Sequence, residues 1–142
     1  MIRVNFYDLN TIEDSKLRFA VIVARYSDKW IFVRHKKRET WEIPGGHREK
    51  DEDINYTASR ELIEETGAKD FNIIPICIYS VCRGEEESFG QLFYAKVESL
   101  EELPDFEIGE VKLFDSIPEN LTYPMIQPYL FNKIDKYLKI LN

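Results

Sequence analysis

Two apolar runs near the start of the chain predict a pair of adjacent β-strands. Residues 18–26 (RFAVIVARY) are rich in β-branched side chains, as expected for a buried strand. Residues 29–34 (KWIFVR) have the composition of its partner, and Ser27 and Asp28 supply the turn between them. Residues 1–7 add a candidate edge strand.

Two later segments have the features of helices. Asp53 is a candidate N-cap, strong helix formers follow it as far as Thr66, and Gly67 is a good helix-stop residue. The C-terminal segment from Pro124 repeats apolar residues at helical spacing, which predicts one buried face. These residues are Ile126, Leu130, Ile134, Leu138 and Leu141.

Further strand segments are 41–43, 71–81, 89–97 and 111–114. The first is stopped by the Pro-Gly-Gly run at 44–46, a polar turn around Gly84 joins the next two, and an acidic loop over 99–110 precedes the last. The order of strands, helix, strands and helix predicts an α/β fold: one mixed β-sheet with helices on both faces, an α/β/α sandwich. No linker divides the chain, so residues 1–142 are expected to form a single domain.

The charge of the chain narrows the class of ligand. Its formal net charge is −7, which disfavours binding to a nucleic-acid backbone, because Lys and Arg hold most of such contacts. A small polyphosphate remains compatible, since bound metal ions can reverse the local sign of the charge.

The cysteines and the N-terminus indicate a cytoplasmic protein. Cys77 and Cys82 are five residues apart on a predicted strand, so they face opposite sides and are expected to be buried free thiols. Residues 1–9 lack the apolar run of a signal peptide, and no stretch reaches membrane-spanning length.

The helix predicted after Asp53 concentrates carboxylates on one side. At 100° per residue, Glu64 lies about 60° to one side of Glu61 and Glu65 about 40° to the other, an arc of roughly 100°. Oxygen ligands grouped in this way suit Mg²⁺ or Mn²⁺, which are hard cations. A solvated acidic face is the alternative, but the Gly-Gly pair ahead of the helix, where backbone can approach a ligand closely, favours a site.

The segment 46–68 resembles the Nudix box, whose pattern is Gly, five residues, Glu, seven residues, and then Arg-Glu-aliphatic-any-Glu-Glu-any-Gly-aliphatic. Ala68 is smaller than the usual final aliphatic residue. The flanks at 41–46 (WEIPGG) and 110–118 are also similar to the family. The matching residues are Gly46, Glu52, Arg60, Glu61, Leu62, Glu64, Glu65 and Gly67.

The resemblance implies a Nudix-type sandwich and an Mg²⁺ cofactor, for which Mn²⁺ can substitute. The implied metal ligands are the carboxylates of Glu61, Glu64 and Glu65, the carbonyl of Gly45, and a fourth carboxylate from Glu110 with Glu107 as the alternative.

Other box positions have implied supporting and catalytic roles. One of the box glutamates serves as general base, with Glu61 and Glu64 placed among the catalytic residues. Arg60 orients the carboxylates through its rigid fork of donors, Glu52 supports the loop or the metal shell, and Gly67 has a structural role.

Candidate substrate-binding residues come from the box and from the segment just before it. Residues 34–38 (RHKKR) are basic, and Arg34 is the first candidate for a phosphate contact because it closes a strand. His47 and Gly46 follow as candidates beside the phosphates, and Trp41 is the candidate for stacking on a base.

The resemblance implies a hydrolase of phosphoanhydride bonds, and the small size is most similar to the MutT-type branch. A nucleoside triphosphate is the first-ranked substrate, including oxidised purines such as 8-oxo-dGTP. The alternatives are a nucleoside diphosphate derivative such as ADP-ribose, a dinucleoside polyphosphate, or a nucleotide-binding regulatory module. The expected partner is this small molecule, with no nucleic acid and no membrane, and the protein is expected to be a monomer or homodimer.

Overall fold

The computed structural model describes residues 1–102 and 108–141. Its strands are β1 (Ile2–Tyr7), β2 (Leu17–Tyr26), β3 (Lys29–His35), β4 (Gly45–His47), β5 (Ala68–Arg83), β6 (Glu86–Leu100) and β7 (Ile108–Phe114). Its helices are α1 (Ile54–Thr66), α2 (Gln127–Leu141) and a short 3₁₀ turn, η1 (Asp14–Lys16).

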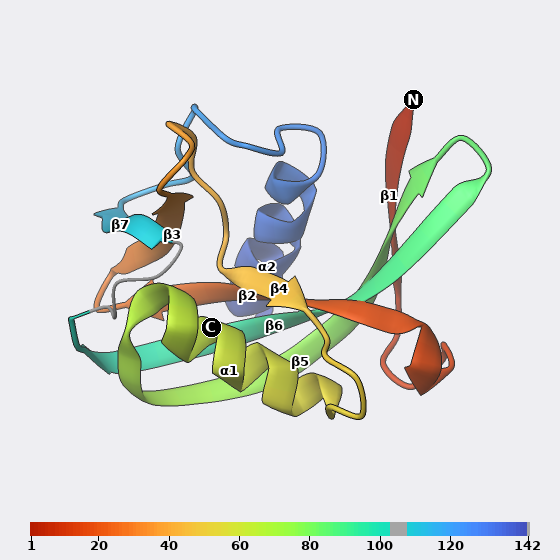
Figure 1. Ribbon diagram of the computed structural model, residues 1–142, viewed down its shortest axis with the longest axis horizontal. Coiled ribbons are helices and arrows are strands. Elements are labelled where there is room, and N and C mark those ends of the chain that lie inside the picture. The colour runs from red at the N-terminus through yellow and green to blue at the C-terminus, as the bar shows by residue number, and fades with distance from the viewer. Residues whose placement is uncertain (103–107, 142) are drawn as a thin grey trace.

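The described strands form one mixed sheet in the order β1-β5-β6-β2-β3-β7, with β4 paired to β2. The β2–β6 pair is parallel and the other pairs are antiparallel. Helices α1 and α2 lie on opposite faces of this sheet (Figure 1). The α/β/α sandwich predicted from the sequence is therefore confirmed.

Two apolar cores, one on each face, hold the layers together. The α1 face buries Ile54, Ala58 and Leu62 against the sheet. On the other face, Leu130 and Ile134 of α2 pack against the sheet. Full burial of each leucine or isoleucine contributes roughly 1.5–3 kcal/mol relative to exposure.

Several predicted boundaries were wrong. Residues 41–43 form only isolated bridges, Val33↔Glu42 and Trp41↔Leu121, instead of a strand. The glycines expected in a turn instead form β4, because their missing side chains let this segment lie against β2: a β-carbon on Gly45 would stand 2.5 Å from the Ala20 carbonyl oxygen.

The central hairpin is longer than the sequence predicted. Strands β5 and β6 extend to Ala68 and Leu100 because residues beyond the apolar runs still pair across the hairpin, as in Asp70↔Ser99. Pro75 is accommodated beside a register shift in the β5–β6 ladder, where a missing N–H is tolerated. The predicted acidic loop over 99–110 is shortened at both ends, while residues 103–107 lie outside the described chain.

The C-terminal helix begins at Gln127, three residues after the predicted start at Pro124. Ile126 precedes the helix, and Leu141 is 63% exposed, so the predicted buried face is shorter than expected. Cys77 and Cys82 are both buried and free, as predicted. Within the described chain, neither helix combines the length and apolar character needed to cross a bilayer.

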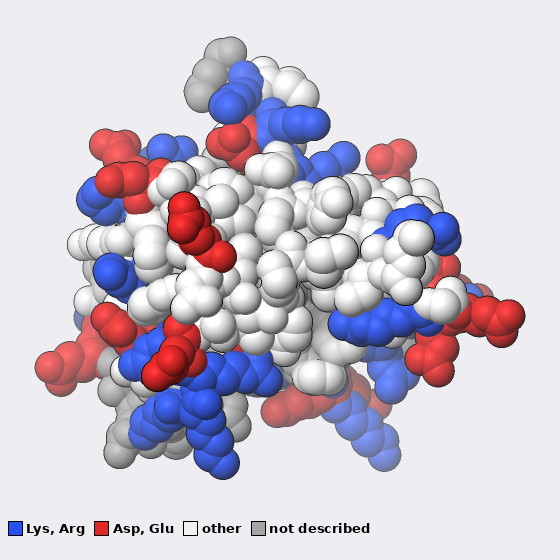
Figure 2. Space-filling view, turned by 90° about the horizontal axis from the view of Figure 1, so that it is seen from above, with Lys and Arg blue, Asp and Glu red and all other residues white. Residues whose placement is uncertain are grey.

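The surface charge is distributed around the margin of the face seen from above. Uncharged residues occupy the middle of this face, and acidic and basic side chains are interspersed around them (Figure 2). The net charge of −7 therefore does not collect into one acidic field on this face.

Candidate functional site

The carboxylate-bearing helix α1 has well-defined ends. The Asp53 side chain accepts a hydrogen bond from the Asn55 N–H at 2.8 Å and caps the start of the helix. Gly67 ends it in the left-handed region (φ 77°), and its N–H donates to the Ile63 carbonyl. These caps fix the two ends of α1, and with them the positions of its carboxylates along the sheet.

Arg60 organises the carboxylates around it. Its Nε donates to Glu52 at 2.6 Å, and its Nη1 donates to Glu61 at 2.8 Å and lies 3.3 Å from Glu64. Its Nη2 donates to the His47 carbonyl at 3.1 Å, which ties α1 to β4. This fork of donors is the arrangement expected of a group that orients carboxylates.

Glu52 is strongly stabilised in its charged form. The Arg60 guanidinium lowers the pKa of Glu52 to about 2, against the opposing effect of burial, and hydrogen bonds from Thr57 Oγ1 and the Glu49 N–H add to this. The same contact raises the pKa of Arg60. Glu52 therefore connects the loop before α1 to the helix.

The box glutamates differ in their surroundings. Glu65 is buried and accepts the Gly45 N–H at 2.9 Å, whereas the Glu64 side chain is 49% exposed. Glu61 lies directly behind Gly46, where a β-carbon would stand 2.3 Å from its carboxylate. Only a glycine at position 46 lets β4 pass this close to the Glu61 carboxylate.

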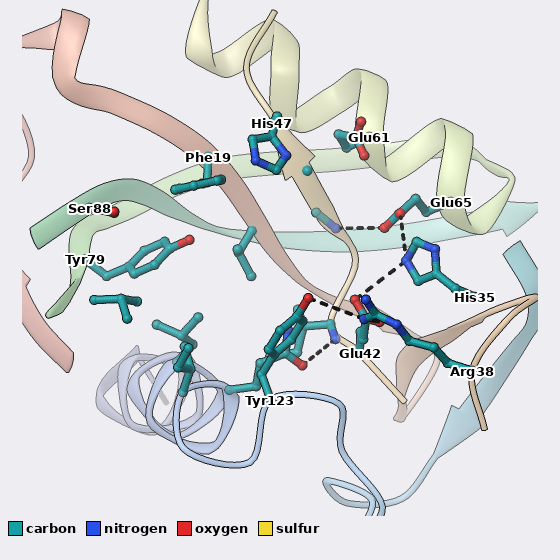
Figure 3. Close-up of a pocket in the computed structure, with 18 of the residues that line it drawn as sticks. Phe19, His35, Arg38, Glu42, His47, Glu61, Glu65, Tyr79, Ser88 and Tyr123 are labelled. Atoms are coloured by element: carbon teal, nitrogen blue, oxygen red, sulfur yellow. Dashed lines mark hydrogen bonds and ion pairs between the residues drawn. The ribbon is translucent and has the colours of Figure 1, made fainter. Parts of the chain in front are cut away.

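A cavity of about 920 Å³ brings these residues together with a basic loop. Glu61, Glu65 and Arg60 line it at the box, and the loop at 35–38 lines it from the end of β3. Figure 3 shows Glu61 and Glu65 on the helix side and His35 and Arg38 on the loop side. Much of the remaining wall is apolar or aromatic, with polar residues that include Arg83, Ser88 and Gln127. The apolar and aromatic residues include Phe19, Val21, Tyr79, Val81, Ile126 and Leu130.

Glu42 joins the basic loop to the acidic helix, a role that the sequence did not reveal. His35 Nε2 lies 3.6 Å from a Glu42 oxygen and 3.6 Å from a Glu65 oxygen. Arg38 Nη1 donates to the second Glu42 oxygen at 3.0 Å and to the Tyr123 hydroxyl at 3.4 Å. Glu42 is buried, with 8% of its surface exposed. In the sequence, the only sign of this position was a charged residue between the apolar residues Trp41 and Ile43.

The carboxylate oxygens of the box glutamates are the type of ligand that a hard divalent cation prefers. Glu61 and Glu65 present carboxylates to the cavity, and Glu64 lies on the same side of α1. Within residues 1–102 and 108–141, no three acidic, histidine or cysteine side chains converge as a ready-made ligand set. Arg60 Nη1 lies 2.8 Å from Glu61, whose charge it offsets, and His35 Nε2 lies 3.6 Å from Glu65.

Arg34, Trp41 and Glu110 are among the sequence candidates that lie outside the cavity lining. Arg34 donates to the Arg38 carbonyl at 3.0 Å and lies 3.6 Å from the Glu110 carboxylate, so it braces the basic loop from behind. Trp41 packs edge-on against Phe114 at 5.1 Å between ring centroids. His47 and Gly46 do line the cavity, and Glu107 lies outside the described residues.

Comparisons with known proteins agree with this geometry. The family model described as NUDIX domain matches residues 15–129. The Bacillus subtilis protein named "Putative 8-oxo-dGTP diphosphatase YtkD" is 34% identical over 102 residues, covering 71% of this chain. The match spans 64% of that protein, slightly less than two thirds of its length.

Solved structures show the same fold. The Bacillus subtilis pyrophosphohydrolase BsRppH superposes with a TM-score of 0.78 at 26% identity, over 96% of this chain and 90% of that one. A Caenorhabditis elegans Ap4A hydrolase superposes with a TM-score of 0.67 at 18% identity, over 86% and 98% of the two chains. With the family match covering most of the sequence, these findings establish that the chain belongs to the Nudix domain family.

Proposed function

We propose that this chain is an Mg²⁺-dependent pyrophosphohydrolase that cleaves a phosphoanhydride bond of a nucleoside triphosphate. The observation that carries the proposal is one cavity lined by Glu61 and Glu65 on one side and by the basic loop at 35–38 on the other. A polyphosphate needs both, because its anionic oxygens require cations and its hydrolysis requires an activated water.

The metal ion, when bound by the box carboxylates, would neutralise phosphate charge and lower the pKa of a bound water. Glu65 is held for such a role by the Gly45 N–H, and Glu61 by Arg60. One of these two carboxylates accepts the proton of the attacking water. Glu64 is proposed as a further ligand from the same side of the helix.

The basic loop holds the outer phosphates. Lys36, Lys37 and Arg38 all line the cavity, and Arg38 is oriented by Glu42. Arg34 shapes the loop by donating to the Arg38 carbonyl instead of reaching the cavity. The proposed phosphate contacts therefore come from 36–38.

One relative, YtkD, supports a nucleoside triphosphate as the substrate class. YtkD is named for 8-oxo-dGTP, which makes oxidised purine nucleotides the first substrates to examine. The structure named for Ap4A is similar at 18% identity and supports the fold alone. ADP-ribose and dinucleoside polyphosphates are the alternative substrates, because the fold alone does not distinguish them from a nucleoside triphosphate.

A substrate panel tests the proposal. Wild type is incubated with Mg²⁺ and each of dGTP, 8-oxo-dGTP, ADP-ribose and Ap4A, and released products are quantified by chromatography. We expect pyrophosphate and a nucleoside monophosphate from a triphosphate. Binding of nucleotides without turnover of any of them would contradict the enzyme and favour a regulatory binding module.

A further inference from the structure

The sheet register sets a row of positions across the floor of the cavity. Tyr79 of β5 pairs with Gly90 of β6, and Gly90 pairs in turn with Phe19 of β2. Phe19 then pairs with His47 of β4. Directly paired residues share a face of the sheet, so the side chains of Tyr79, Phe19 and His47 lie in one row. Gly90, which has no side chain, leaves a gap in this row between Tyr79 and Phe19.

Gly90 is the gap that lets Tyr79 reach across the row. A β-carbon at position 90 would stand 2.6 Å from the Tyr79 ring and hydroxyl, so the ring lies over this glycine. Figure 3 shows the Tyr79 hydroxyl directed into the cavity on the side of Phe19. The glycine thus determines where the hydroxyl is presented.

The Tyr79 hydroxyl is a polar group at the cavity lining. Tyr79 is 5% exposed as a whole residue and lines the cavity. Among residues 1–102 and 108–141, the fully enclosed side-chain polar atom without a partner is Arg25 Nε, so the Tyr79 hydroxyl is an atom that borders the cavity. Burial raises the pKa of Tyr79, so the phenol remains protonated and can donate. A hydroxyl that borders a cavity can donate a hydrogen bond to a ligand atom there.

Phe19 and His47 supply an aromatic surface next to this hydroxyl. Their rings meet edge-on with centroids 4.7 Å apart, and both line the cavity. Phe19 is partly exposed, which leaves ring surface available to a planar ligand. The neighbouring wall residues Val21 and Val81 are apolar, as a nucleobase site requires.

We propose that Tyr79, Phe19 and His47 form the nucleobase subsite. The base stacks on Phe19 beside His47, and the Tyr79 hydroxyl donates a hydrogen bond to an acceptor atom on the edge of the base. This inference rests on the proposed function, since phosphates bound between the box and the basic loop would direct the nucleoside along the row.

Binding measurements separate the base from the phosphates. The probes are the non-hydrolysable α,β-methylene analogue of dGTP and inorganic tripolyphosphate, each titrated by calorimetry with Mg²⁺ present. Tyr79→Phe removes only the hydroxyl. We expect its Kd for the dGTP analogue to rise about 3- to 10-fold, the range for one lost hydrogen bond, with an unchanged Kd for tripolyphosphate.

Tyr94→Phe is the matched control, because Tyr94 is a partly buried tyrosine of β6 outside the cavity lining. It should change neither Kd. Phe19→Leu provides a second variant, which keeps an apolar side chain but removes the stacking surface and should also weaken the dGTP analogue alone.

An unchanged Kd for the dGTP analogue in both Tyr79→Phe and Phe19→Leu would overturn the subsite, as would an equal loss of tripolyphosphate binding. Turnover of dGTP by wild type is recorded in parallel. If wild type binds the analogue through Tyr79 but releases no pyrophosphate, the proposed reaction fails while the subsite stands.

Discussion

Gly46 on β4 lies so close to Glu61 on α1 that a β-carbon at position 46 would stand 2.3 Å from the carboxyl carbon. The contact is with the end of a flexible side chain, so Gly46→Ala should displace the Glu61 carboxylate without unfolding the protein. We expect kcat to fall about 10²-fold, as for a catalytic group moved by about 1 Å, with little change in Tm.

Gly84→Ala is the matched control for this variant. Gly84 has φ 62° and no atom near the position of a β-carbon, so alanine there is strained but touches nothing. It should lower the stability by about 1 kcal/mol and leave kcat unchanged. Normal turnover by Gly46→Ala would refute the role of this close approach.

Glu65→Gln should abolish most activity while preserving the fold. The Gln carbonyl can still accept the Gly45 N–H, so the 2.9 Å contact survives while the negative charge is lost. We expect kcat for Glu65→Gln and for Glu61→Gln to fall by at least ~10²-fold. Glu98→Gln, an exposed substitution on β6 outside the cavity, should retain wild-type kcat.

Removal of divalent cations should stop the reaction. Carboxylates alone repel a polyphosphate, so activity should disappear in EDTA and return with excess Mg²⁺ or Mn²⁺. Mg²⁺ should also raise the Tm of wild type more than that of Glu65→Gln, because a ligand that binds only the folded state stabilises it. Undiminished turnover in chelator would exclude a metal role for these carboxylates.

Acid stability should depend on Glu52. Its pKa is about 2 in the folded protein and near 4.5 when unperturbed, so between these pH values the unfolded state binds the extra proton. The stabilisation is therefore complete above pH 4.5 and is lost as the pH falls toward 2. The free energy of unfolding of Glu52→Gln, measured from pH 7 to pH 3 by urea denaturation, should decline less steeply than that of wild type.

The same Glu98→Gln variant serves as the control for this pH series, and it should follow the wild-type curve. Parallel curves for Glu52→Gln and wild type would contradict a depressed Glu52 pKa in the folded protein.

The sequence predicted the helical part of the site because that part is local. Fixed spacing on α1 places Glu61 and Glu65 on one side, and the caps at Asp53 and Gly67 were visible as residue types. The sequence did not predict β4, because Gly45 and Gly46 have the composition of a turn and form a strand only through pairing with β2.

The other half of the site depends on long-range register. Phe19 and Tyr79 are brought into one row only by the β2–β6 and β5–β6 ladders, and strand register across a parallel pair is not encoded in a short segment. Nothing in the sequence indicated that the Trp41 ring packs edge-on against Phe114, and a base contact by Trp41 stays a prediction. The contact of Glu42 with His35 likewise required the three-dimensional arrangement.

The position of bond cleavage tests the central claim most directly. If the loop at 36–38 holds the outer phosphates while the box carboxylates act on an inner one, wild type with Mg²⁺ should convert dGTP to dGMP and pyrophosphate. Hydrolysis in ¹⁸O-labelled water, followed by mass spectrometry, should place the label in dGMP for attack at the α phosphorus or in pyrophosphate for attack at the β phosphorus. Release of labelled orthophosphate with dGDP would contradict this arrangement.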